Sequence, residues 1–584
     1  MLQTRGACCR LAARGADSRR FILYNPSPMS ELTLNGRKIS FKPGQSILAA
    51  ALDAQIEVPH YCYHPSLSVV ANCRICLGEV WIPNAKTGKL DLIPKLVPTC
   101  QQAASEGMVV YTDSPKAVEN QKAVMEYLLI NHPVDCAVCD QAGECTLQDY
   151  SYEYGRGASR FEEAKNKKAK KDVGPNILLY SDRCIMCTRC VRFTSEVTQT
   201  HELMIDGRGS HESIDIFPGM PLDNELASNV IDLCPVGALL DKDFLFQQRV
   251  WFLKKTASID GITSSGDNLS AEHNEGRIYR LKPRFNADVN KWWITDEVRY
   301  GWKFVHAEAR ISLPSIKRAD GTREEFSKLD PRGAFDTTYA HINASLQALV
   351  KKRLALLLSP MLSCEDTFSL VRLALSIDPN ATIGLGPVPI VGADKTISGF
   401  VIRAEKAPNA RGVRRVANAM LAAKGNTTGI LEFANFEREV ASAAIGAVLT
   451  TGNYPSAWTT PALVAALAGK FVIAIDTLPN AITAIADVVL PSATWLEKSG
   501  SFESATGRLQ SFDQAIEPIE FSRSEAQIGM DLAALRASVP AQKFNADGVR
   551  KELAKYAGLD AFSTALHQPP PRAPVDSDMV LVEL

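Results

Sequence analysis

The hydrophobic pattern near the start of the chain indicates a small sheet followed by a helix. Apolar and polar residues alternate over 32–34 and 39–41, on either side of Asn35-Gly36. An Asn-Gly pair between alternating segments predicts a β-hairpin with a tight turn. Residues 46–55 then place apolar side chains at helical spacing, which predicts a short helix.

The pattern changes in the second half of the chain, where short, fully apolar segments alternate with apolar helical stretches from His341 onward. Fully apolar segments of this length are typical of strands buried on both faces, so the alternation predicts an α/β domain with a mostly parallel sheet. The expected strands are 354–358, 383–385, 430–433, 447–450 and 471–475.

Composition and charge exclude several classes of protein. The 584 residues exceed the size of one hydrophobic core, and 46% hydrophobic with 22% charged residues predicts a folded, soluble, multidomain chain. A net charge of -1 gives no support for binding of nucleic acid or of an acidic membrane surface. The longest apolar stretch, 462–475, carries Lys470, so we expect membrane contact only through partner subunits.

Residues 1–28 are rich in arginine and fit either a mitochondrial presequence or an upstream extension.

Cysteines are concentrated in one region, because 11 of the 14 lie between Cys62 and Cys234. Clustered cysteines in a reducing compartment are more often metal ligands than disulfides. The first group has ten, two and twenty-three residues between successive members, and its members are Cys62, Cys73, Cys76 and Cys100. One close pair with distant partners resembles the ligands of a [2Fe-2S] ferredoxin. A structural zinc site is the alternative, although zinc favours two matched pairs.

The second group packs three cysteines into one loop: Cys136, Cys139 and Cys145. A [4Fe-4S] cluster needs a fourth ligand, and His132 is the nearest candidate. A single histidine is more often a surface or capping residue. If His132 is a ligand, its neutral imidazole makes the cluster less negative than four thiolates would, which raises the reduction potential.

The third group has two residues between successive cysteines and ends in a remote Cys-Pro, as in bacterial [4Fe-4S] sequences. Its members are Cys184, Cys187, Cys190 and Cys234. Eleven cysteines and His132 make twelve ligands, enough for three clusters with four each. The ligand count therefore predicts one [2Fe-2S] and two [4Fe-4S] clusters, while Cys364 is assigned no function.

These groups, in this order, resemble the large iron–sulfur subunit of respiratory complex I, the NADH:quinone oxidoreductase. The resemblance covers about residues 31–310 and is carried by His60-Tyr61-Cys62-Tyr63-His64, Asn72-Cys73-Arg74-Ile75-Cys76, Asn131-His132-Pro133-Val134-Asp135-Cys136, Gln141-Ala142-Gly143-Glu144-Cys145 and Ile231-Asp232-Leu233-Cys234-Pro235. From there to about Gln510 the chain has a weaker resemblance to the molybdopterin oxidoreductase fold. The clearest motif of this resemblance is residues 486–491. The loop between Cys76 and Cys100 is longer than usual for the family.

The resemblance implies a multidomain α+β and α/β protein that carries electrons and performs no bond chemistry of its own. Electrons would arrive from NADH through a flavin on a neighbouring subunit, pass the Cys62 cluster, then the Cys184 cluster, then the His132 cluster, and leave toward quinone-proximal iron–sulfur subunits. The expected place is the peripheral arm of the complex, on the cytoplasmic face of a bacterial inner membrane or the matrix face of the mitochondrial one. No molybdopterin is expected, and the additional [4Fe-4S] centre of some bacterial members should be missing.

The patterns and the resemblance together divide the chain into seven expected segments. They are a presequence or extension (1–28), a ferredoxin-like [2Fe-2S] β-grasp domain (29–110), a [4Fe-4S] domain with one histidine and three cysteine ligands (111–155), a [4Fe-4S] ferredoxin-like domain (156–252), a small β-rich domain (253–335), a degenerate molybdopterin-oxidoreductase-like α/β domain (336–540) and a C-terminal tail (541–584).

Three other functions remain as alternatives. The catalytic subunit of an iron hydrogenase or formate dehydrogenase shares such cluster domains, but it would need further metal-binding cysteines downstream, where only Cys364 occurs. The electron-transfer subunit of an NAD-linked hydrogenase would lack the long α/β extension. A zinc-stabilised scaffold would contain no iron, so an iron and sulfide assay separates it from the others.

Overall fold

The computed structural model describes residues 30–326, 331–348 and 352–563. The expected presequence or extension, 1–28, lies outside these residues. The described chain divides into two compact units, one made of residues 30–60 and Val69–Val124, the other of Tyr61–Ser68 and the residues from Met125 onward. None of the described helices is both long and apolar enough to cross a lipid bilayer.

The first unit is built on a six-stranded sheet with the order β2-β1-β6-β3-β4, to which β5 adds by pairing with β3. Asn35 and Gly36 both have positive φ, at 48° and 76°, and form the predicted hairpin turn. The predicted helix is α1 (Ile47–Asp53), which begins where the Ser46 hydroxyl accepts a hydrogen bond from the Ala49 amide. The strands are β1 (Ser30–Leu34), β2 (Arg37–Phe41), β3 (Leu77–Pro83), β4 (Leu90–Leu92), β5 (Val97–Pro98) and β6 (Val109–Tyr111).

The second unit opens with a region of short elements connected by long loops. A three-stranded sheet with the order β11-β8-β7 packs against short helices and the β9–β10 hairpin. The elements are α2 (Pro115–Ile130, which begins in the first unit), α3 (Thr146–Glu153), β7 (Lys170–Asp172), β8 (Ile177–Tyr180), α4 (Arg189–Arg192), β9 (Leu203–Asp206), β10 (Ser213–Ile216), α5 (Asn229–Leu233) and β11 (Leu239–Asp241). Another three-stranded antiparallel sheet follows: β12 (Lys254–Ile259), β13 (Asn268–Asn274) and β14 (Arg277–Pro283), with α6 (Asp296–Tyr300) after it.

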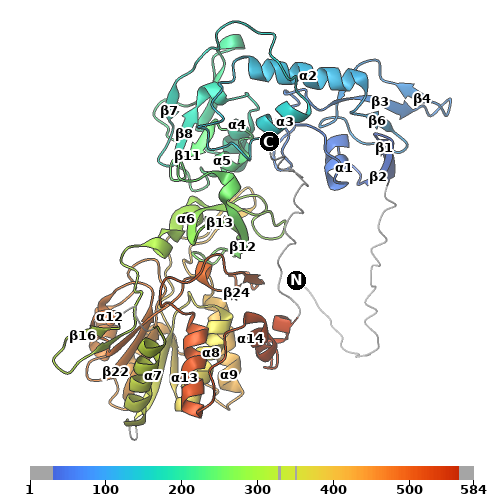
Figure 1. The fold of residues 1–584 in the computed structure, drawn as a ribbon. Coiled ribbons are helices and arrows are strands. Elements are labelled where there is room, and N and C mark those ends of the chain that lie inside the picture. Colours follow the sequence, from blue (N-terminus) through green and yellow to red (C-terminus); the bar gives the residue numbers. More distant parts are fainter. Residues whose placement is uncertain (1–29, 327–330, 349–351, 564–584) are drawn as a thin grey trace, which may run out of the picture. The chain divides into compact units, whose positions relative to one another are not determined.

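The described residues from Ser315 onward form a seven-stranded sheet with the order β16-β15-β23-β22-β21-β17-β18. Its strands β16 and β22 are labelled in Figure 1. The five strands β23, β22, β21, β17 and β18 pair in parallel, whereas β15 pairs antiparallel with both β23 and β16. The strands are β15 (Ser315–Lys317), β16 (Arg323–Glu325), β17 (Arg353–Leu358), β18 (Thr382–Leu385), β21 (Ile445–Thr451), β22 (Phe471–Asp476) and β23 (Val488–Pro491). The α/β prediction is therefore correct for this part.

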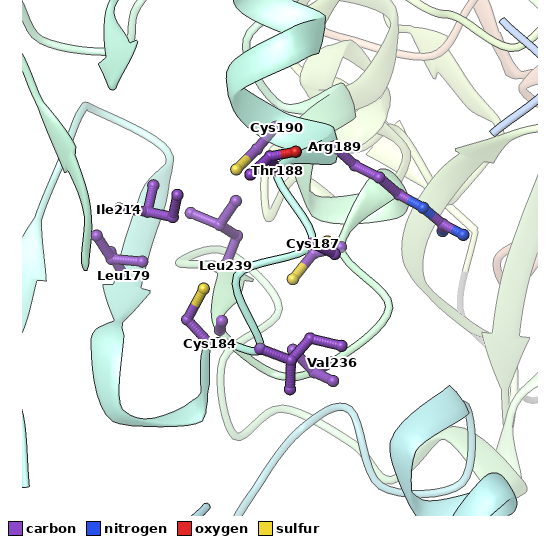
Figure 2. A pocket seen from close by; sticks show the side chains of 12 residues that line it. Leu179, Cys184, Cys187, Thr188, Arg189, Cys190, Ile214, Val236 and Leu239 are labelled. Atoms are coloured by element: carbon purple, nitrogen blue, oxygen red, sulfur yellow. The ribbon is translucent and has the colours of Figure 1, made fainter. Parts of the chain in front are cut away.

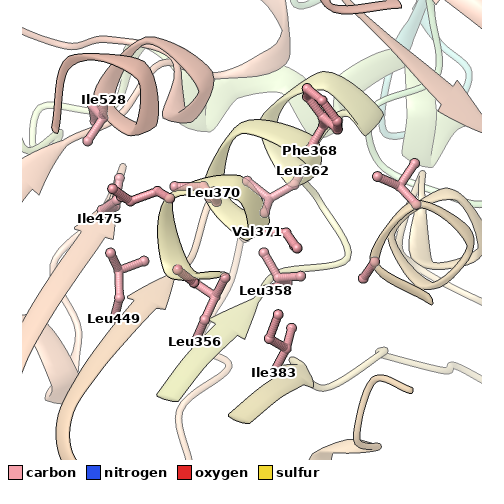
Figure 3. Packing of buried hydrophobic residues seen from close by; sticks show 14 of the residues in the cluster. Leu356, Leu358, Leu362, Phe368, Leu370, Val371, Ile383, Leu449, Ile475 and Ile528 are labelled. Carbon is pink, nitrogen blue, oxygen red and sulfur yellow. The ribbon is translucent and has the colours of Figure 1, made fainter. Parts of the chain in front are cut away.

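Helices cover both faces of this sheet, which explains why its parallel strands are mostly apolar on both sides. Alternate residues of β17 point to opposite cores, Leu356 and Leu358 to one and Leu357 to the other. Figure 3 shows the first core, where Leu356 and Leu358 meet Phe368 and Val371. The helices are α7 (Pro331–Ala348), α8 (Cys364–Ile377), α9 (Ala410–Ala422), α10 (Phe433–Val440), α11 (Pro461–Ala466), α12 (Ala481–Ile485), α13 (Glu525–Ala537) and α14 (Ala546–Leu553).

Two smaller hairpins extend from this part of the chain. They are β19 (Lys395–Ile397) with β20 (Phe400–Ile402), and β24 (Gly500–Glu503) with β25 (Leu509–Phe512). The first packs Phe400 and Ile402 into the core of the cysteine-rich region, and the Ser398 hydroxyl donates to the carbonyl of Val197 at 2.9 Å.

Three sequence-based expectations differ from the structure. Residues 430–433 form no strand: Leu431 makes one isolated bridge with Gly384, and α10 begins at Phe433. Strands β15 and β16 belong to the seven-stranded sheet, so the α/β part starts before residue 336. The expected tail also contains α14, whose Val549 and Leu553 are buried in the first core. Its residues 541–563 are therefore part of the α/β fold.

Candidate metal centres

The clearest candidate centre is a small cavity lined by all four members of the third cysteine group: Cys184, Cys187, Cys190 and Cys234. Figure 2 labels the first three of them around the cavity. Cys184 follows the turn after β8, Cys190 lies in α4, and Cys234 ends α5. Met186 and Thr188 have positive φ, at 51° and 60°, which curls the Cys184–Cys190 segment around the cavity.

Apolar surroundings keep these thiols neutral in the absence of a metal. Burial raises the pKa of Cys184 to about 12 and that of Cys187 to about 11, and it raises the pKa of Cys190 well above its usual range. Nearby thiolates raise each of these values further, so four thiolates are stable together only with a bound cation. Four convergent thiols beside Arg189, two on buried and two on half-buried residues, fit an iron–sulfur cluster, which carries a net negative charge.

His132 has the properties of a neutral nitrogen ligand. Burial, reinforced by the positive charge of Arg183, lowers the pKa of His132 to about 4. Its Nδ1 atom is buried and has no hydrogen-bond partner. A neutral imidazole with an unsatisfied buried nitrogen fits a ligand at this position, because metals bind the neutral ring.

The cysteines of the second group lie in one loop but differ in their exposure to solvent. Cys139 and Cys145 are buried, whereas Cys136 is exposed. Burial raises the pKa of Cys145 to about 12. Arg249 holds the loop from outside by donating to the carbonyls of Cys136, Ala137 and Cys139, each at 3.1 Å.

The ligand segments of the second and third groups touch each other. A Cβ atom at Gly237 would lie 2.3 Å from the Sγ of Cys139, so only glycine fits there. The Thr146 amide, next to Cys145, donates to the carbonyl of Pro235 at 3.1 Å. The Cys-Pro-Val-Gly segment that carries Cys234 therefore supports the other group directly.

Three members of the first group lie in the first unit. Cys76 and Cys100 are each 1% exposed, and Cys73 is half-buried. The Thr99 hydroxyl donates to the Cys76 carbonyl at 2.8 Å, which joins the β3 and β5 segments that carry the two buried thiols. Cys62 belongs to the second unit and is also buried.

Among the described residues, no three His, Cys, Asp or Glu side chains converge as they would around a single metal ion. An iron–sulfur cluster needs a different arrangement, because each thiolate binds a separate iron and the inorganic core lies between the ligands. Residue spacing had identified the candidate ligands; it had not identified Arg249 or Gly237 as their supports.

Five family models match successive parts of the chain. They are the 2Fe-2S iron-sulfur cluster binding domain (27–115), the NADH-ubiquinone oxidoreductase-G iron-sulfur binding region (121–160), the NADH-quinone oxidoreductase subunit 3, ferredoxin-like domain (174–240), the NADH-ubiquinone oxidoreductase NDSU1/NuoG-like, 4Fe-4S domain (253–303) and the molybdopterin oxidoreductase (402–535). Residues 253–303 contain no cysteine, so this 4Fe-4S-type domain lacks thiolate ligands of its own.

Curated relatives match about half of the chain. The 78 kDa subunit of mitochondrial NADH-ubiquinone oxidoreductase of Neurospora crassa is 42% identical over 310 residues, 53% of this chain and 40% of that protein. The G subunit of NADH-quinone oxidoreductase of Rickettsia felis is 34% identical over 352 residues, 60% of this chain and 50% of that protein. The chain thus spans half or less of the length of these relatives.

Among solved structures, a chain of an NAD+-reducing [NiFe]-hydrogenase in the H2-reduced state is 27% identical, with a TM-score of 0.32; the match covers 38% of this chain and 91% of that chain. The successive iron–sulfur domains and the curated relatives agree on one family. Over the matched part, the chain is similar to the G subunit of NADH-quinone oxidoreductase and to its mitochondrial counterpart, the 78 kDa subunit.

Proposed function

We propose that this protein is an electron-transfer subunit of an NADH:quinone oxidoreductase. The observation that carries the proposal is the buried cavity where Cys184, Cys187, Cys190 and Cys234 converge, in contact with the loop of the second group through Gly237. Each bound cluster supplies a one-electron carrier, and the protein supplies its ligands, burial and local charge.

The proposed ligands are those indicated by the sequence. One [2Fe-2S] cluster would be held by Cys62, Cys73, Cys76 and Cys100. One [4Fe-4S] cluster would be held by His132, Cys136, Cys139 and Cys145, and the other by Cys184, Cys187, Cys190 and Cys234. The direct contact between the last two ligand sets supports electron transfer between them.

The proposed partners are the flavin-binding, NADH-oxidising subunit on one side and quinone-proximal iron–sulfur subunits on the other. The relatives come from mitochondria and from bacteria, which is consistent with a peripheral place at either membrane. The α/β part would serve structure and docking without molybdopterin. Its sole cysteine, Cys364, is fully buried, which supports this role.

Metal analysis of the full chain, purified without oxygen, tests the proposal. The three clusters require about ten iron atoms per chain, with matching sulfide. Cys190→Ala should remove one [4Fe-4S] signal from the electron paramagnetic resonance (EPR) spectrum, while Cys364→Ala, the matched control, should leave all signals in place. Four iron atoms or fewer, or zinc in their place, would overturn the proposal. Copurification with a flavin-containing NADH-oxidising subunit would support the proposed partner.

A further inference from the structure

Arg192, at the end of α4, connects two of the proposed cluster sites through a single buried guanidinium. Its side chain donates to the carbonyl oxygens of Cys62 and Ser68, each at 2.5 Å, and to that of Cys187 at 3.2 Å. Nη2 is the shared atom, since it makes the bonds to both Cys62 and Cys187. Arg192 is 7% exposed, and its Nε donates to the Thr188 hydroxyl at 3.3 Å.

The charge of this guanidinium is not neutralised by an acidic side chain. In the described part of the chain, Arg192 forms no ion pair with a carboxylate, and its hydrogen-bond acceptors are neutral oxygens. A buried charge without an opposite charge is costly. Clusters ligated by four thiolates are negative, so the two proposed sites beside Arg192 would supply the missing negative charge.

Arg189 provides a useful contrast within the same helix. It lines the Cys184 cavity and donates to the carbonyl of Tyr63 at 2.6 Å. Its second acceptor is the carbonyl of Leu233, at 3.4 Å. Arg189 therefore shares the segment 62–68 with Arg192 but contacts no carbonyl of a proposed ligand, whereas Arg192 contacts two.

We propose that Arg192 is a positioning residue that couples the Cys62 site to the Cys184 site; this rests on the proposed function. The chain of bonds runs from the Cys62 side chain through its carbonyl, across Nη2, to the carbonyl and side chain of Cys187. One electron passes from the reduced to the oxidised site, and no bond is formed or broken. The positive charge between the sites favours the reduced form of each.

Two variants separate the effect of the Arg192 hydrogen bonds, which bridge the two sites, from the effect of its charge. Arg192→Lys keeps the charge, but a lysine ammonium cannot reproduce the planar set of hydrogen bonds, so the midpoint potentials should stay and the transfer rate should fall on the order of tenfold. Arg192→Gln also removes the charge and should lower both potentials. Arg284→Lys is the matched control, because Arg284 likewise donates to carbonyls, those of Leu269 and Ser258, away from the cysteines.

The measurements are EPR redox titration and freeze-quench kinetics of the full chain with its clusters. Slower transfer in Arg192→Lys at unchanged potentials, with Arg284→Lys like the wild type, supports the bridge. Wild-type transfer rates in Arg192→Lys would overturn it, as would loss of both clusters, because Arg192 would then be needed only for folding. A wild-type protein that lacks the two signals would instead overturn the proposed function, and this inference with it.

Discussion

Asp135 and Arg183 form an ion pair between the residues that immediately precede Cys136 and Cys184. The Arg183 Nε and Nη2 atoms donate to Asp135 Oδ2 at 3.0 and 2.8 Å, and the Arg183 side chain is 3% exposed. The guanidinium also lies 4.1 Å from the ring centroid of Tyr180. With the Gly237 contact, this pair makes the loops of the two proposed [4Fe-4S] sites one packed assembly, so a change in one ligand loop should affect the other site.

Gly237→Ala should remove the proposed His132 cluster although it changes no proposed ligand. The added Cβ would lie 2.3 Å from Cys139 Sγ, which must then move away. We expect strong loss of the corresponding EPR signal, with the Cys184 signal reduced less. Gly157→Ala is the control, because a Cβ at Gly157 meets no atom within 4 Å. A full complement of iron in Gly237→Ala would show that the loop can shift without losing its cluster.

His132→Cys should keep a cluster but lower its midpoint potential. The thiolate adds a negative charge where the neutral imidazole had none, and this disfavours the reduced form. EPR redox titration of both proteins gives the shift directly. If His132→Ala left the spectrum and the potential unchanged, another group would have to be the fourth ligand.

The central sheet could be predicted from the sequence, and the ligand sets could be proposed from it, because both depend on local patterns. Two-residue spacings between cysteines are typical of metal-binding loops, and continuous apolar segments such as 354–358 are typical of strands buried on both faces. Strands β15 and β16 could not be predicted, since each has three residues and largely polar sequence. The strand expected at 430–433 was wrong because a short apolar segment also suits the start of a helix such as α10.

The supports of the candidate sites could not be predicted from the sequence either. Arg183 and Asp135 are separated by 48 positions, and Arg192 and Cys62 by 130. Their contacts depend on how loops pack, which no local periodicity encodes. Arginines near the third cysteine group are equally typical of a solvated surface, and only their burial and hydrogen bonds distinguish the two roles.

Lys498→Met should strongly destabilise the α/β part. The Lys498 ammonium pairs with Asp366 at 2.8 Å and with Glu525 at 2.5 Å, and both acids are 0% exposed. Without the lysine, two carboxylates remain buried without a counter-charge, which costs about 3–5 kcal/mol. Urea unfolding measures the loss, and Lys424→Met, at an exposed lysine, is the control.

The defect of Lys498→Met should also depend on pH. Burial raises the pKa of Glu525 above its unfolded value, and removal of Lys498 raises it further. A carboxyl group with a raised pKa in the folded state favours folding at low pH and opposes it as pH rises through that pKa. The loss of stability should therefore be larger at pH 8 than at pH 5, and an equal loss at both would argue that packing is responsible.

Cys364→Ala should leave electron transfer and metal content unchanged. The thiol is 0% exposed, and the Asn409 amide donates to Sγ at 3.5 Å. A Cβ at Gly412 would lie 2.8 Å from the same sulfur, so the thiol is packed on that side by α9. Burial raises the pKa of Cys364 far above its usual range, which disfavours the thiolate that a metal would require. The sulfur therefore behaves as a small apolar side chain of the core.

The cost of Cys364→Ala should be a packing defect of about 1 kcal/mol. Ser363→Ala is the matched control, because Ser363 caps α8 and its loss should cost a similar amount without touching the sulfur. Activity of the assembled complex should also survive growth without molybdate or tungstate. Stoichiometric molybdenum in the purified protein, lost in Cys364→Ala but kept in Ser363→Ala, would contradict the prediction. Because the two variants should lose similar stability, only a role of the sulfur in binding the metal would explain that difference.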